Sequence, residues 1–427
     1  MPGRVCWYHA AVAQLRCIFL IGVCLAAQLS SVAGEWPQIL GPSRNGIAAA
    51  DEKLADAWPA GGPPVLWQRN VGRGYAGIVI ADGRGVVFHR VADREVVEAF
   101  DPATGKTLWT DGHPTTFQPQ VGGGDGPLCT PVIHAGRVIT YGAQGVLSCH
   151  DAASGKLLWR RDTHREFAAP EGYFGAGSSP LVVAKVVVVN VGGSRQEAGI
   201  VGFALDSGAT LWTASAEPAS YSSPVAVDIS GEPHVVMITR YKCLLLEPQT
   251  GAIRWEFRFG MRGPTVNAAL PVVRTDPTGH ALLVTAAYGI GTVEGTFTRE
   301  AFAQRWDGID ALASQYCTPI AQGPHVYCID GRDDMPPATL TCVELATGRV
   351  LWAEKNFGYG TLLAADGKLI AAKTDGELLL MRASPEGMTI LARHRPLPGT
   401  LRALPALADG RLYVRDDNTL VCLQLAP

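Results

Sequence analysis

The sequence predicts an all-β fold: a closed ring of eight four-stranded antiparallel blades, which is a β-propeller. A hairpin that ends in Gly-x-x-x-Trp recurs five times, and the Trp residues that mark successive units lie about 40 to 55 residues apart. Four-stranded repeats of that length are typical of propellers. The incomplete units at the two ends of the chain add a third observation, which predicts that the first strand closes the ring.

The recurrent hairpin has an interpretable physical design. Ser or Thr precedes the Gly, and in four copies an acidic residue opens the turn. Gly supplies the positive φ that the turn needs, the acidic side chain can cap the turn backbone, and the Trp can pack on a neighbouring unit. The five copies are DPATGKTLW (101–109), DAASGKLLW (151–159), ALDSGATLW (204–212), EPQTGAIRW (247–255) and ELATGRVLW (344–352).

A second pattern, upstream of each hairpin, supplies the other strands. CTPVIHAGRVITYG (129–142) and CTPIAQGPHVYCID (317–330) each read as a strand that opens with Pro, a turn with Gly and a second alternating strand. Pro is acceptable at the first position of a strand, because its missing N–H breaks no ladder bond there. Each unit is therefore predicted to hold four antiparallel strands.

Counting units by the closing Trp gives eight blades, with seven as the alternative. Leu391 takes the place of Trp in a degenerate unit, and the unit of Trp306 lacks the Thr-Gly turn. The residues predicted to dock neighbouring blades are Trp67, Trp109, Trp159, Trp212, Trp255, Trp306 and Trp352.

The ends of the chain predict how the ring closes. Residues 401–425 hold three strands and no fourth, whereas the strand around Trp67 has no strands before it. Three strands plus one complete a blade, so the N-terminal strand is expected to join the last blade. We assign residues 34–62 to an N-terminal extension and residues 63–427 to the propeller.

Residues 1–33 predict a signal peptide. The apolar run at 17–29 is shorter than the about 20 residues that span a bilayer, and Ser31 and Ala33 fit a cleavage site. An uncleaved anchor is the alternative, while Val23 before Cys24 disfavours a lipoprotein. The leader predicts a periplasmic or secreted chain with no transmembrane segment after cleavage.

Composition narrows the class of protein further. Hydrophobic residues make up 47% of the chain and charged residues 18%, which supports a large core. The net charge of −3 provides no basic surface for nucleic acid. Seven Cys remain after the leader, without zinc spacing or a disulfide framework, although one bridge stays open. We expect a monomer.

The Asp-x-x-(Thr/Ser)-Gly-x-x-x-Trp hairpin resembles the tryptophan-docking repeat of pyrroloquinoline quinone (PQQ) propellers. The resemblance spans residues 63–425, and residues 35–49 resemble the opening of exported bacterial propellers. That family includes PQQ-dependent alcohol dehydrogenases and a propeller lipoprotein of the outer-membrane assembly machine. The resemblance implies the fold and a structural role for the repeat Trp and Gly residues, whereas fold does not imply function.

A PQQ-dependent oxidoreductase acting on alcohols or sugars is the alternative function. The resemblance implies a vicinal Cys pair and a Ca²⁺ held by Glu, Asn and Asp for such enzymes, but no two Cys are adjacent and no segment matches. We interpret the acidic clusters at 330–334 and 416–418 as solvated turns. No cofactor is assigned, and PQQ with calcium remains part of the alternative.

Binding is predicted at the mouth of the central channel, on the loops before each innermost strand. Five of seven such loops place Tyr at nearly the same point. Aromatic faces and polar groups could hold a protein, a peptide or a glycan, and the alternative is that these Tyr pack the blades. The predicted binding residues are Arg73, Tyr75, Tyr173, Tyr221, Asn267, Tyr316, Tyr359 and Arg402.

Long loops at 113–127 and 161–177 enlarge this mouth. His113 and His164 lie there without a partner acid or nucleophile nearby in sequence, so we interpret each as a surface or packing residue. No catalytic motif is found, and the catalytic residues of any enzyme reading are unknown. The sequence therefore predicts an exported binding or scaffold module of the cell envelope, with a protein, peptide or glycan as its partner.

Overall fold

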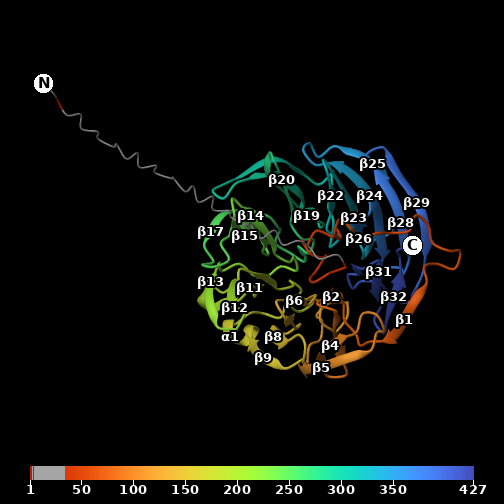
Figure 1. Cartoon of the computed structure of the whole chain (residues 1–427), viewed down its shortest axis with the longest axis horizontal. Coiled ribbons are helices and arrows are strands. Elements are labelled where there is room, and N and C mark those ends of the chain that lie inside the picture. Colours follow the sequence, from red (N-terminus) through yellow and green to blue (C-terminus); the bar gives the residue numbers. More distant parts are fainter. Residues whose placement is uncertain (2, 4–33) are drawn as a thin grey trace. The chain divides into compact units, whose positions relative to one another are not determined.

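Each repeat identified in the sequence is one four-stranded antiparallel sheet in the computed structural model. The structure describes residues 1, 3 and 34–427, so the predicted signal peptide lies outside the described residues apart from positions 1 and 3. Eight sheets are arranged as blades around a central axis (Figure 1). The eight-bladed prediction is confirmed, and the seven-bladed alternative is wrong.

Seven blades are continuous in the sequence. Their strands are β2 (Val79–Ala81), β3 (Arg84–Val91), β4 (Arg94–Phe100) and β5 (Thr107–Pro114); β6 (Val132–His134), β7 (Arg137–Tyr141), β8 (Val146–Asp151) and β9 (Leu157–Asp162); β10 (Leu181–Val183), β11 (Val186–Asn190), β12 (Ile200–Ala204) and β13 (Thr210–Ala214); β14 (Val225–Ile229), β15 (Glu232–Ile238), β16 (Lys242–Leu246) and β17 (Ile253–Arg258); β18 (Val272–Asp276), β19 (Gly279–Ala286), β20 (Gly291–Phe297) and β21 (Phe302–Gly308); β22 (Ile320–Gln322), β23 (His325–Arg332), β24 (Met335–Glu344) and β25 (Val350–Glu354); and β26 (Gly360–Ala365), β27 (Lys368–Lys373), β28 (Leu378–Ser384) and β29 (Gly387–His394).

The eighth blade joins the two ends of the chain. β30 (Ala406–Ala408), β31 (Arg411–Arg415) and β32 (Thr419–Gln424) supply three strands, and β1 (Val65–Asn70) supplies the fourth. β1 pairs antiparallel with β32, with Trp67 opposite Cys422. In Figure 1 the orange β1 lies beside the blue β32. The predicted closure by the first strand is confirmed.

Within residues 34–427, two short helices lie outside the blades: α1 (Thr163–Phe167) and the 3-10 helix η1 (Arg195–Glu197). No described helix is long and apolar enough to cross a membrane. The seven Cys of residues 34–427 are all buried and free, and they lie on or next to the strands. Each behaves as a small hydrophobic side chain of the core.

The seven marked Trp residues connect the blades. Each indole N–H donates a hydrogen bond of 2.8 to 3.0 Å to a backbone carbonyl oxygen in the next blade. Even Trp306, whose own unit is degenerate, makes this bond. The accepting residues, in the order of the Trp residues from Trp67 to Trp352, are Pro102, Ala152, Leu205, Pro248, Thr298, Leu345 and Ser384.

The repeat glycines make this docking possible. Gly155 has a φ of 73°, and a Cβ there would come within 2.5 Å of the Trp109 ring. The turn is also capped as predicted, because Asp101 Oδ1 accepts from Ala103 N at 2.7 Å. Glycine is therefore required for two reasons: the turn needs a positive φ at this position, and the indole ring leaves no room for a Cβ.

One seam of the ring has no Trp. Leu391 on β29 is partly buried and packs against the core that contains Leu420 and Leu423 of the last blade. A docking turn between the third and fourth strands cannot exist there, because β32 and β1 are opposite ends of the chain. The substitution of Leu for Trp thus falls where no turn could receive an indole.

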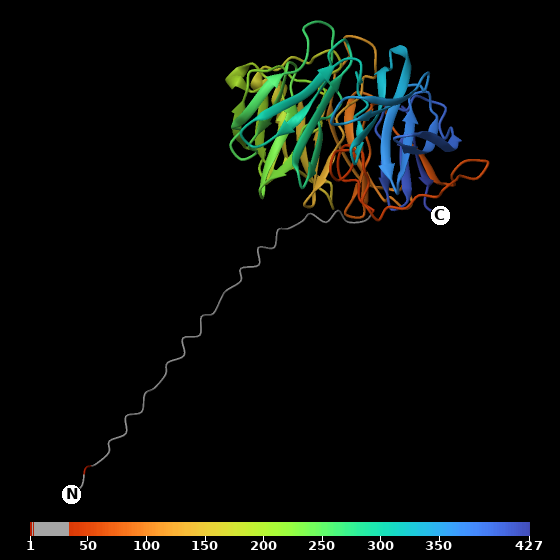
Figure 2. The ribbon, with the colours of Figure 1, turned by 90° about the horizontal axis from the view of Figure 1, so that it is seen from above.

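The N-terminal extension crosses one end of the central channel. Trp36 N donates to Ile80 O at 2.6 Å in the first blade, and Ala48 N donates to Ala364 O at 2.9 Å in the seventh. Between them, the buried Arg44 donates to Pro224 O at 2.8 Å and also contacts Pro180 O. Burial lowers the pKa of Arg44 to about 9. Figure 2 shows this red and orange segment along the lower end of the ring.

Candidate functional site

The antiparallel strand order sorts the connections onto two faces. The loops between blades, together with the turns between second and third strands, form one face, here called the funnel face. The turns that receive the Trp indoles lie on the opposite face, here called the docking face. The funnel face is therefore the face on which the predicted binding loops gather.

A cavity of about 370 Å³ opens at the centre of the funnel face, and we call it the funnel. Every one of the eight blades contributes to its lining. Its floor includes Ile39 and Leu40 of the N-terminal extension, both of which are buried. The extension, whose role the sequence did not reveal, therefore forms part of the funnel's floor.

The structure brings four of the predicted binding residues together in the funnel wall: Tyr75, Tyr221, Tyr316 and Arg402. Tyr316 packs edge-to-face on Tyr359, with ring centroids 4.6 Å apart. Its hydroxyl has no hydrogen-bond partner within the part of the chain that the structure describes. Burial raises the pKa of Tyr316 well above its ordinary value, so this buried hydroxyl stays protonated.

Two of the predicted residues are structural in this arrangement. Tyr359 is buried, and its hydroxyl accepts from Tyr316 N at 2.7 Å and Cys317 N at 3.0 Å. Asn267 is also buried, and its Nδ2 donates to Thr239 O and Arg240 O, each at 3.1 Å. For Tyr359 the packing alternative describes the observed contacts, and Asn267 likewise makes its contacts within the protein.

The other two predicted residues lie near the rim. Arg73 is half-exposed and pairs with Asp125, with Nη1 and Oδ2 3.0 Å apart. Tyr173 is exposed and lines a second, smaller cavity beside the funnel. Tyr221 and Gly177 line both cavities, so the two spaces are neighbours.

Asp333, which the sequence did not single out, organises one wall of the funnel. Its carboxylate pairs with Arg402 and accepts from Thr374 Oγ1 at 2.8 Å. The Arg402 guanidinium lies 5.5 Å from the centre of the Tyr75 ring. Burial alone would lower the pKa of Arg402. The neighbouring carboxylate of Asp333 outweighs this effect, so the pKa of Arg402 is raised.

The interpretation of 330–334 as a solvated turn is wrong for Asp333, whose side chain is only 12% exposed. Its partners follow 41 and 69 residues later, so no local sequence pattern reveals them. The run of acidic residues at 330–334 was the one feature of the sequence that pointed to Asp333. In the second cluster, Asp416 is buried rather than solvated, but it does cap a turn, accepting from Thr419 N at 2.8 Å.

A second Arg–Asp pair lies on the same wall. Arg332 pairs with Asp334, and its guanidinium lies 4.2 Å from the centre of the Tyr288 ring. Asp417 nearby is half-buried and makes no ion pair within 4.0 Å among residues 34–427. Burial raises the pKa of Asp417. The funnel wall and its immediate surroundings are thus polar: Arg402 and Arg332 are each paired with an aspartate, and the neighbouring Asp417 is unpaired.

These side chains do not fit PQQ with calcium. PQQ carries several carboxylates, but Arg402 of the funnel wall and the neighbouring Arg332 are already paired with aspartates. Among the described residues no group of three or more His, Cys, Asp or Glu side chains is placed to hold a metal ion. A calcium site of the kind that hard cations prefer would need several such oxygen donors together.

Exposed apolar side chains share the funnel face with the cavity, and one of them, Val121, lines it. Six large ones, between 39% and 62% exposed, lie on loops and turns of the funnel face. We call this set the apolar rim: Val91, Val121, Tyr173, Met261, Ile309 and Met335. The remaining exposed large hydrophobics of residues 34–427 lie on outermost strands: Val65, Leu66, Leu108, Leu157, Leu158, Leu211 and Val350.

His113 is a packing residue, as one reading of the sequence expected. It is buried, and its Nε2 lies 3.0 Å from Glu95 Oε2. Ala143 N also donates to this carboxylate, at 2.9 Å. His164, in contrast, lines the second cavity.

Comparison with known proteins gives the family context. A protein-family model described as "Outer membrane protein assembly factor BamB" matches residues 92–354. A curated BamB of Shewanella oneidensis is 23% identical over 252 residues, which are 55% of this chain and 59% of that protein. A 1-butanol dehydrogenase (cytochrome c) of Thauera butanivorans is 30% identical over 162 residues, 36% of this chain and 20% of that enzyme. The chain thus spans less than two thirds of both curated relatives.

Solved structures share the fold at low identity. BamB from Moraxella catarrhalis has a TM-score of 0.61 and 17% identity, covering 84% of this chain and 97% of that one. A quinohemoprotein alcohol dehydrogenase from Comamonas testosteroni has a TM-score of 0.65 and 16% identity, covering 92% and 81%. At such identities the likeness shows the fold alone.

Proposed function

Because the chain belongs to the family of the outer membrane protein assembly factor BamB, we propose that it is a scaffold of the cell envelope. In this proposal the funnel face binds a polypeptide that takes part in outer membrane protein assembly. The predicted leader would deliver the chain to that compartment. The periplasm is the side of the envelope at which such a partner would be met.

The observation that carries the proposal is the position of the apolar rim. Contiguous apolar surface on a soluble protein marks an interaction site, whereas single exposed residues are ordinary. Here the six exposed side chains lie on the face into which the funnel opens, and Val121 lines the funnel together with Tyr75, Tyr221 and Tyr316. Tyrosine combines a large apolar surface with a polar tip, which suits a polypeptide interface.

The chemistry favours a polypeptide over the other partner classes. A phosphate-rich partner in the funnel would need an unpaired basic group in its wall, but Arg402 of that wall is engaged with Asp333. The funnel has an apolar floor, which Ile39 and Leu40 provide. Hydrophobic side chains of a polypeptide could enter such a space while its backbone crosses the polar wall.

The test is a pair of matched double substitutions. Val121→Glu with Ile309→Glu places two charges on the rim, and Leu108→Glu with Leu211→Glu places two on the outermost strands. The native side chains are similarly exposed, at 57% and 57% against 52% and 51%. Both variants are purified from the envelope of the chain's own host, and co-purifying polypeptides are quantified by mass spectrometry.

The rim variant is expected to lose most of the polypeptides that wild type retains, and the outer-strand variant to keep them. Circular dichroism and melting temperature check that both variants fold. The opposite pattern would move the binding surface to the outer strands and overturn the proposal.

The oxidoreductase alternative has its own measurement. The Thauera enzyme shares 30% identity over 162 residues, which alone motivates the assay. Purified chain mixed with PQQ and Ca²⁺ is expected to show neither bound quinone absorbance nor alcohol-dependent dye reduction. Turnover with either an alcohol or a sugar would restore the enzyme reading.

A further inference from the structure

The funnel is large enough to enclose a bulky group of a partner. It has about 370 Å³ of space, against about 180 Å³ in the second cavity. An apolar cavity of about 150 Å³ holds a benzene molecule, and pockets for drug-sized ligands begin at about 300 Å³. A large side chain can therefore enter the funnel together with part of the backbone that carries it.

Much of the lining is apolar and open to an occupant. Leu128, Ala268 and Leu404 line the funnel and are partly exposed, and Ile39 and Leu40 close its floor. Five aromatic side chains of the lining are partly exposed as well: Tyr75, Phe174, Tyr221, Tyr288 and Tyr316. An apolar occupant would remove this surface from water, which is favourable.

Polar side chains of the lining bond to the protein itself. Gln315 Nε2 donates to the Tyr288 hydroxyl at 2.8 Å, and Gln315 Oε1 accepts from Asp333 N at 2.9 Å. The Tyr221 hydroxyl accepts from Phe174 N at 3.1 Å. A sugar, which needs many hydrogen-bond partners, would find few of them free.

The charged side chains of the lining are paired. Asp333 pairs with Arg402. Asp334 pairs with the neighbouring Arg332, and the unpaired Asp417 lies outside the lining. A charged occupant would find no free counter-ion among the described lining residues, and burying an unpaired charge is costly. The lining therefore suits a neutral, apolar occupant.

One side of the funnel is a glycine-rich segment of the long loop between β5 and β6. We call residues 121–124, which read Val-Gly-Gly-Gly, the glycine strap, and all four line the funnel. Within residues 34–427 the strap makes no hydrogen bond. Segments with few hydrogen bonds and little buried apolar surface open at low cost, and ligand-binding loops are drawn from them.

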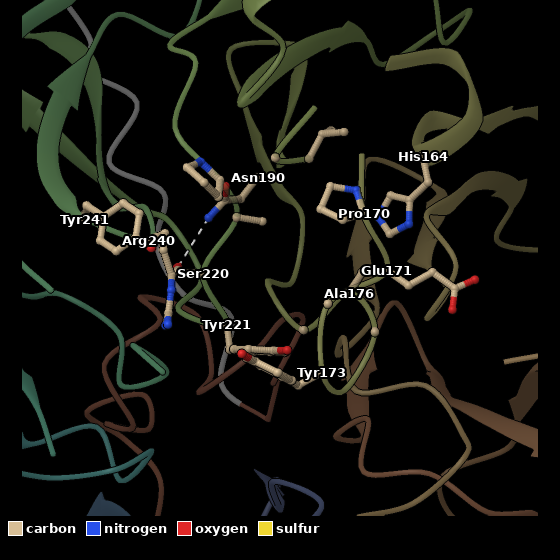
Figure 3. Close-up of a pocket in the computed structure, with 17 residues that line it drawn as sticks. His164, Pro170, Glu171, Tyr173, Ala176, Asn190, Ser220, Tyr221, Arg240 and Tyr241 are labelled. Carbon is tan, nitrogen blue, oxygen red and sulfur yellow. Dashed lines mark hydrogen bonds between the residues drawn. The ribbon is translucent and has the colours of Figure 1, made fainter. Parts of the chain in front are cut away.

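The glycine strap is held at its two ends. Before it, Gln120 N donates to Tyr173 O at 2.9 Å. Figure 3 shows Tyr173 and Tyr221 at the same edge of the second cavity. After the strap, the buried Arg90 donates from Nη1 to Asp125 O at 2.8 Å. Fixed ends and a free middle allow the strap to move while its attachment points stay in place.

The glycine strap lies against two aromatic rings of the funnel wall. A Cβ at Gly124 would come within 3.3 Å of the Tyr75 ring. A Cβ at Gly123 would come within 3.6 Å of the Phe174 ring. Because the strap glycines have no side chains, their backbone can lie directly on the aromatic wall.

We propose that the funnel holds a large apolar side chain of the partner polypeptide, and that the glycine strap moves aside to admit this side chain and then packs over it. The inference rests on the proposed function, because the side chain would belong to the polypeptide bound at the funnel face. It adds the chemical class of the anchoring residue and the element that encloses it. Anchors of this kind, buried in a pocket, carry much of the affinity of an interface.

The probe is phenylnaphthylamine, a neutral dye of two apolar ring systems whose fluorescence rises in apolar surroundings. Its matched control is anilinonaphthalene sulfonate, which has the same ring skeleton and one negative charge. The neutral dye should bind the full chain with a Kd of about 50 µM or below. The sulfonate should bind at least about tenfold more weakly, because its charge finds no free partner in the funnel.

Two alanine substitutions locate the bound dye. Ala268 is a half-buried residue of the lining, whereas Ala209 is exposed in the turn of the docking face that receives Trp159. Ala268→Asp should weaken binding of the neutral dye at least about tenfold, because it places an unpaired charge in the funnel. Ala209→Asp should change the affinity by less than about twofold. If Ala268→Asp fails to fold, Ala268→Phe, which fills the funnel, should weaken the dye in its place.

The same substitution at two positions of the glycine strap tests closure. Gly124→Leu puts a side chain where the Tyr75 ring already lies, so the strap should no longer pack over the dye. Nothing lies within 4 Å of a Cβ at Gly122, so Gly122→Leu is the control. Stopped-flow dilution should show dye dissociation at least about fivefold faster in Gly124→Leu, and within about twofold of wild type in Gly122→Leu.

Equal affinities of the two dyes, or wild-type affinity in the Ala268 variants, would overturn the proposed site. Equal dissociation rates in the two strap variants would overturn the role of the strap. Saturating neutral dye should also release the polypeptides that the wild type captures, and their retention with dye bound would overturn the anchor. Polypeptide capture by a wild type that binds no dye overturns this inference alone. Dye binding in the funnel without polypeptide capture overturns the proposed function.

Discussion

The indole nitrogen of Trp67 donates a 3.0 Å hydrogen bond to the carbonyl oxygen of Pro102, and this contact ties the last blade to the first. Trp67 lies on β1, which belongs to the last blade, whereas Pro102 lies in the docking turn of the first blade. The Trp67 ring also packs against Phe100 and Tyr413, with centroids 5.6 and 5.9 Å away. One side chain therefore connects both ends of the chain to the rest of the ring.

Trp67→Ala is expected to lower the free energy of unfolding by about 2–4 kcal/mol, somewhat less than the about 3–5 kcal/mol of a fully buried aromatic, because Trp67 is partly buried. Urea unfolding monitored by circular dichroism measures this. Leu108→Ala is the control, because Leu108 is exposed on the outermost strand β5 and should cost less than about 0.5 kcal/mol. Equal costs for the two variants would contradict the role of Trp67 in closure.

A pair of glycine substitutions separates indole docking from backbone strain. Gly155 and Gly136 have φ angles of 73° and 71°, so alanine is strained by about 1–2 kcal/mol at each. A Cβ at Gly155 meets the Trp109 ring at 2.5 Å, whereas nothing lies within 4 Å of one at Gly136. Gly155→Ala should therefore cost about 1–3 kcal/mol more than Gly136→Ala. Thermal unfolding of both variants checks the difference.

Arg44 should hold the N-terminal extension across the channel. Arg44→Met removes the donors of at least two buried carbonyls, at Pro180 and Pro224, and should cost about 1–3 kcal/mol. Hydrogen exchange of residues 34–49 should also accelerate. Lys53→Met is the control, since Lys53 is 65% exposed in its ion pair with Asp366 and should matter by less than about 0.5 kcal/mol. Unchanged exchange in Arg44→Met would show that the segment is held by its apolar contacts alone.

His89 should make the fold sensitive to acid. Its Nδ1 accepts from Gly72 N at 2.8 Å, so protonation would remove this acceptor. Burial, with the charge of Arg415, lowers the pKa of His89 to about 4, whereas an unfolded His titrates near 6.5. Between these values the unfolded chain binds more protons, so stability falls as pH decreases from about 6.5 to about 4, by on the order of 3 kcal/mol.

The measurement for His89 is the free energy of unfolding at pH 7 and pH 4.5, in wild type and in His89→Gln. Other groups also titrate in this range, so the informative quantity is the difference between the two pH dependences. The variant should lose less stability on acidification than the wild type does. A parallel loss in both proteins would mean that His89 does not titrate on unfolding.

The repeat made most of the fold predictable. The offset between Gly and Trp encodes a contact between adjacent blades, and adjacent blades are also adjacent in sequence, so a local pattern sufficed. Because the degenerate repeats at Trp306 and Leu391 were also counted as blades, the predicted number of blades was eight, as observed. Closure followed from counting strands at the two ends, because a blade needs four.

The funnel was predictable only in part. The recurring Tyr located Tyr75, Tyr221 and Tyr316, because equivalent loops of a ring share one face. The same recurrence could not distinguish these three Tyr residues from Tyr359, which is buried. Whether each Tyr side chain is exposed depends on its neighbours in space, such as Ser314, whose Oγ lies 3.1 Å from the Tyr359 hydroxyl.

Contacts between segments that are distant in the sequence could not be predicted from it. Arg44 reaches Pro224, 180 residues away, and Asp333 reaches Arg402, 69 residues away. Neither pair carries a periodic pattern, because each occurs once in the ring. The second cavity was missed for the same reason: His164, Asn190 and Arg240 line it from separate segments of the chain.

The central claim is that the funnel face holds a polypeptide, and site-specific photo-cross-linking in the living host tests it most directly. A photoreactive amino acid at Val121, on the rim, is compared with one at Ala153, in the docking turn of the opposite face. We predict a discrete polypeptide adduct from position 121 and at most a trace from position 153. Adducts only from position 153, or from neither position, would contradict it.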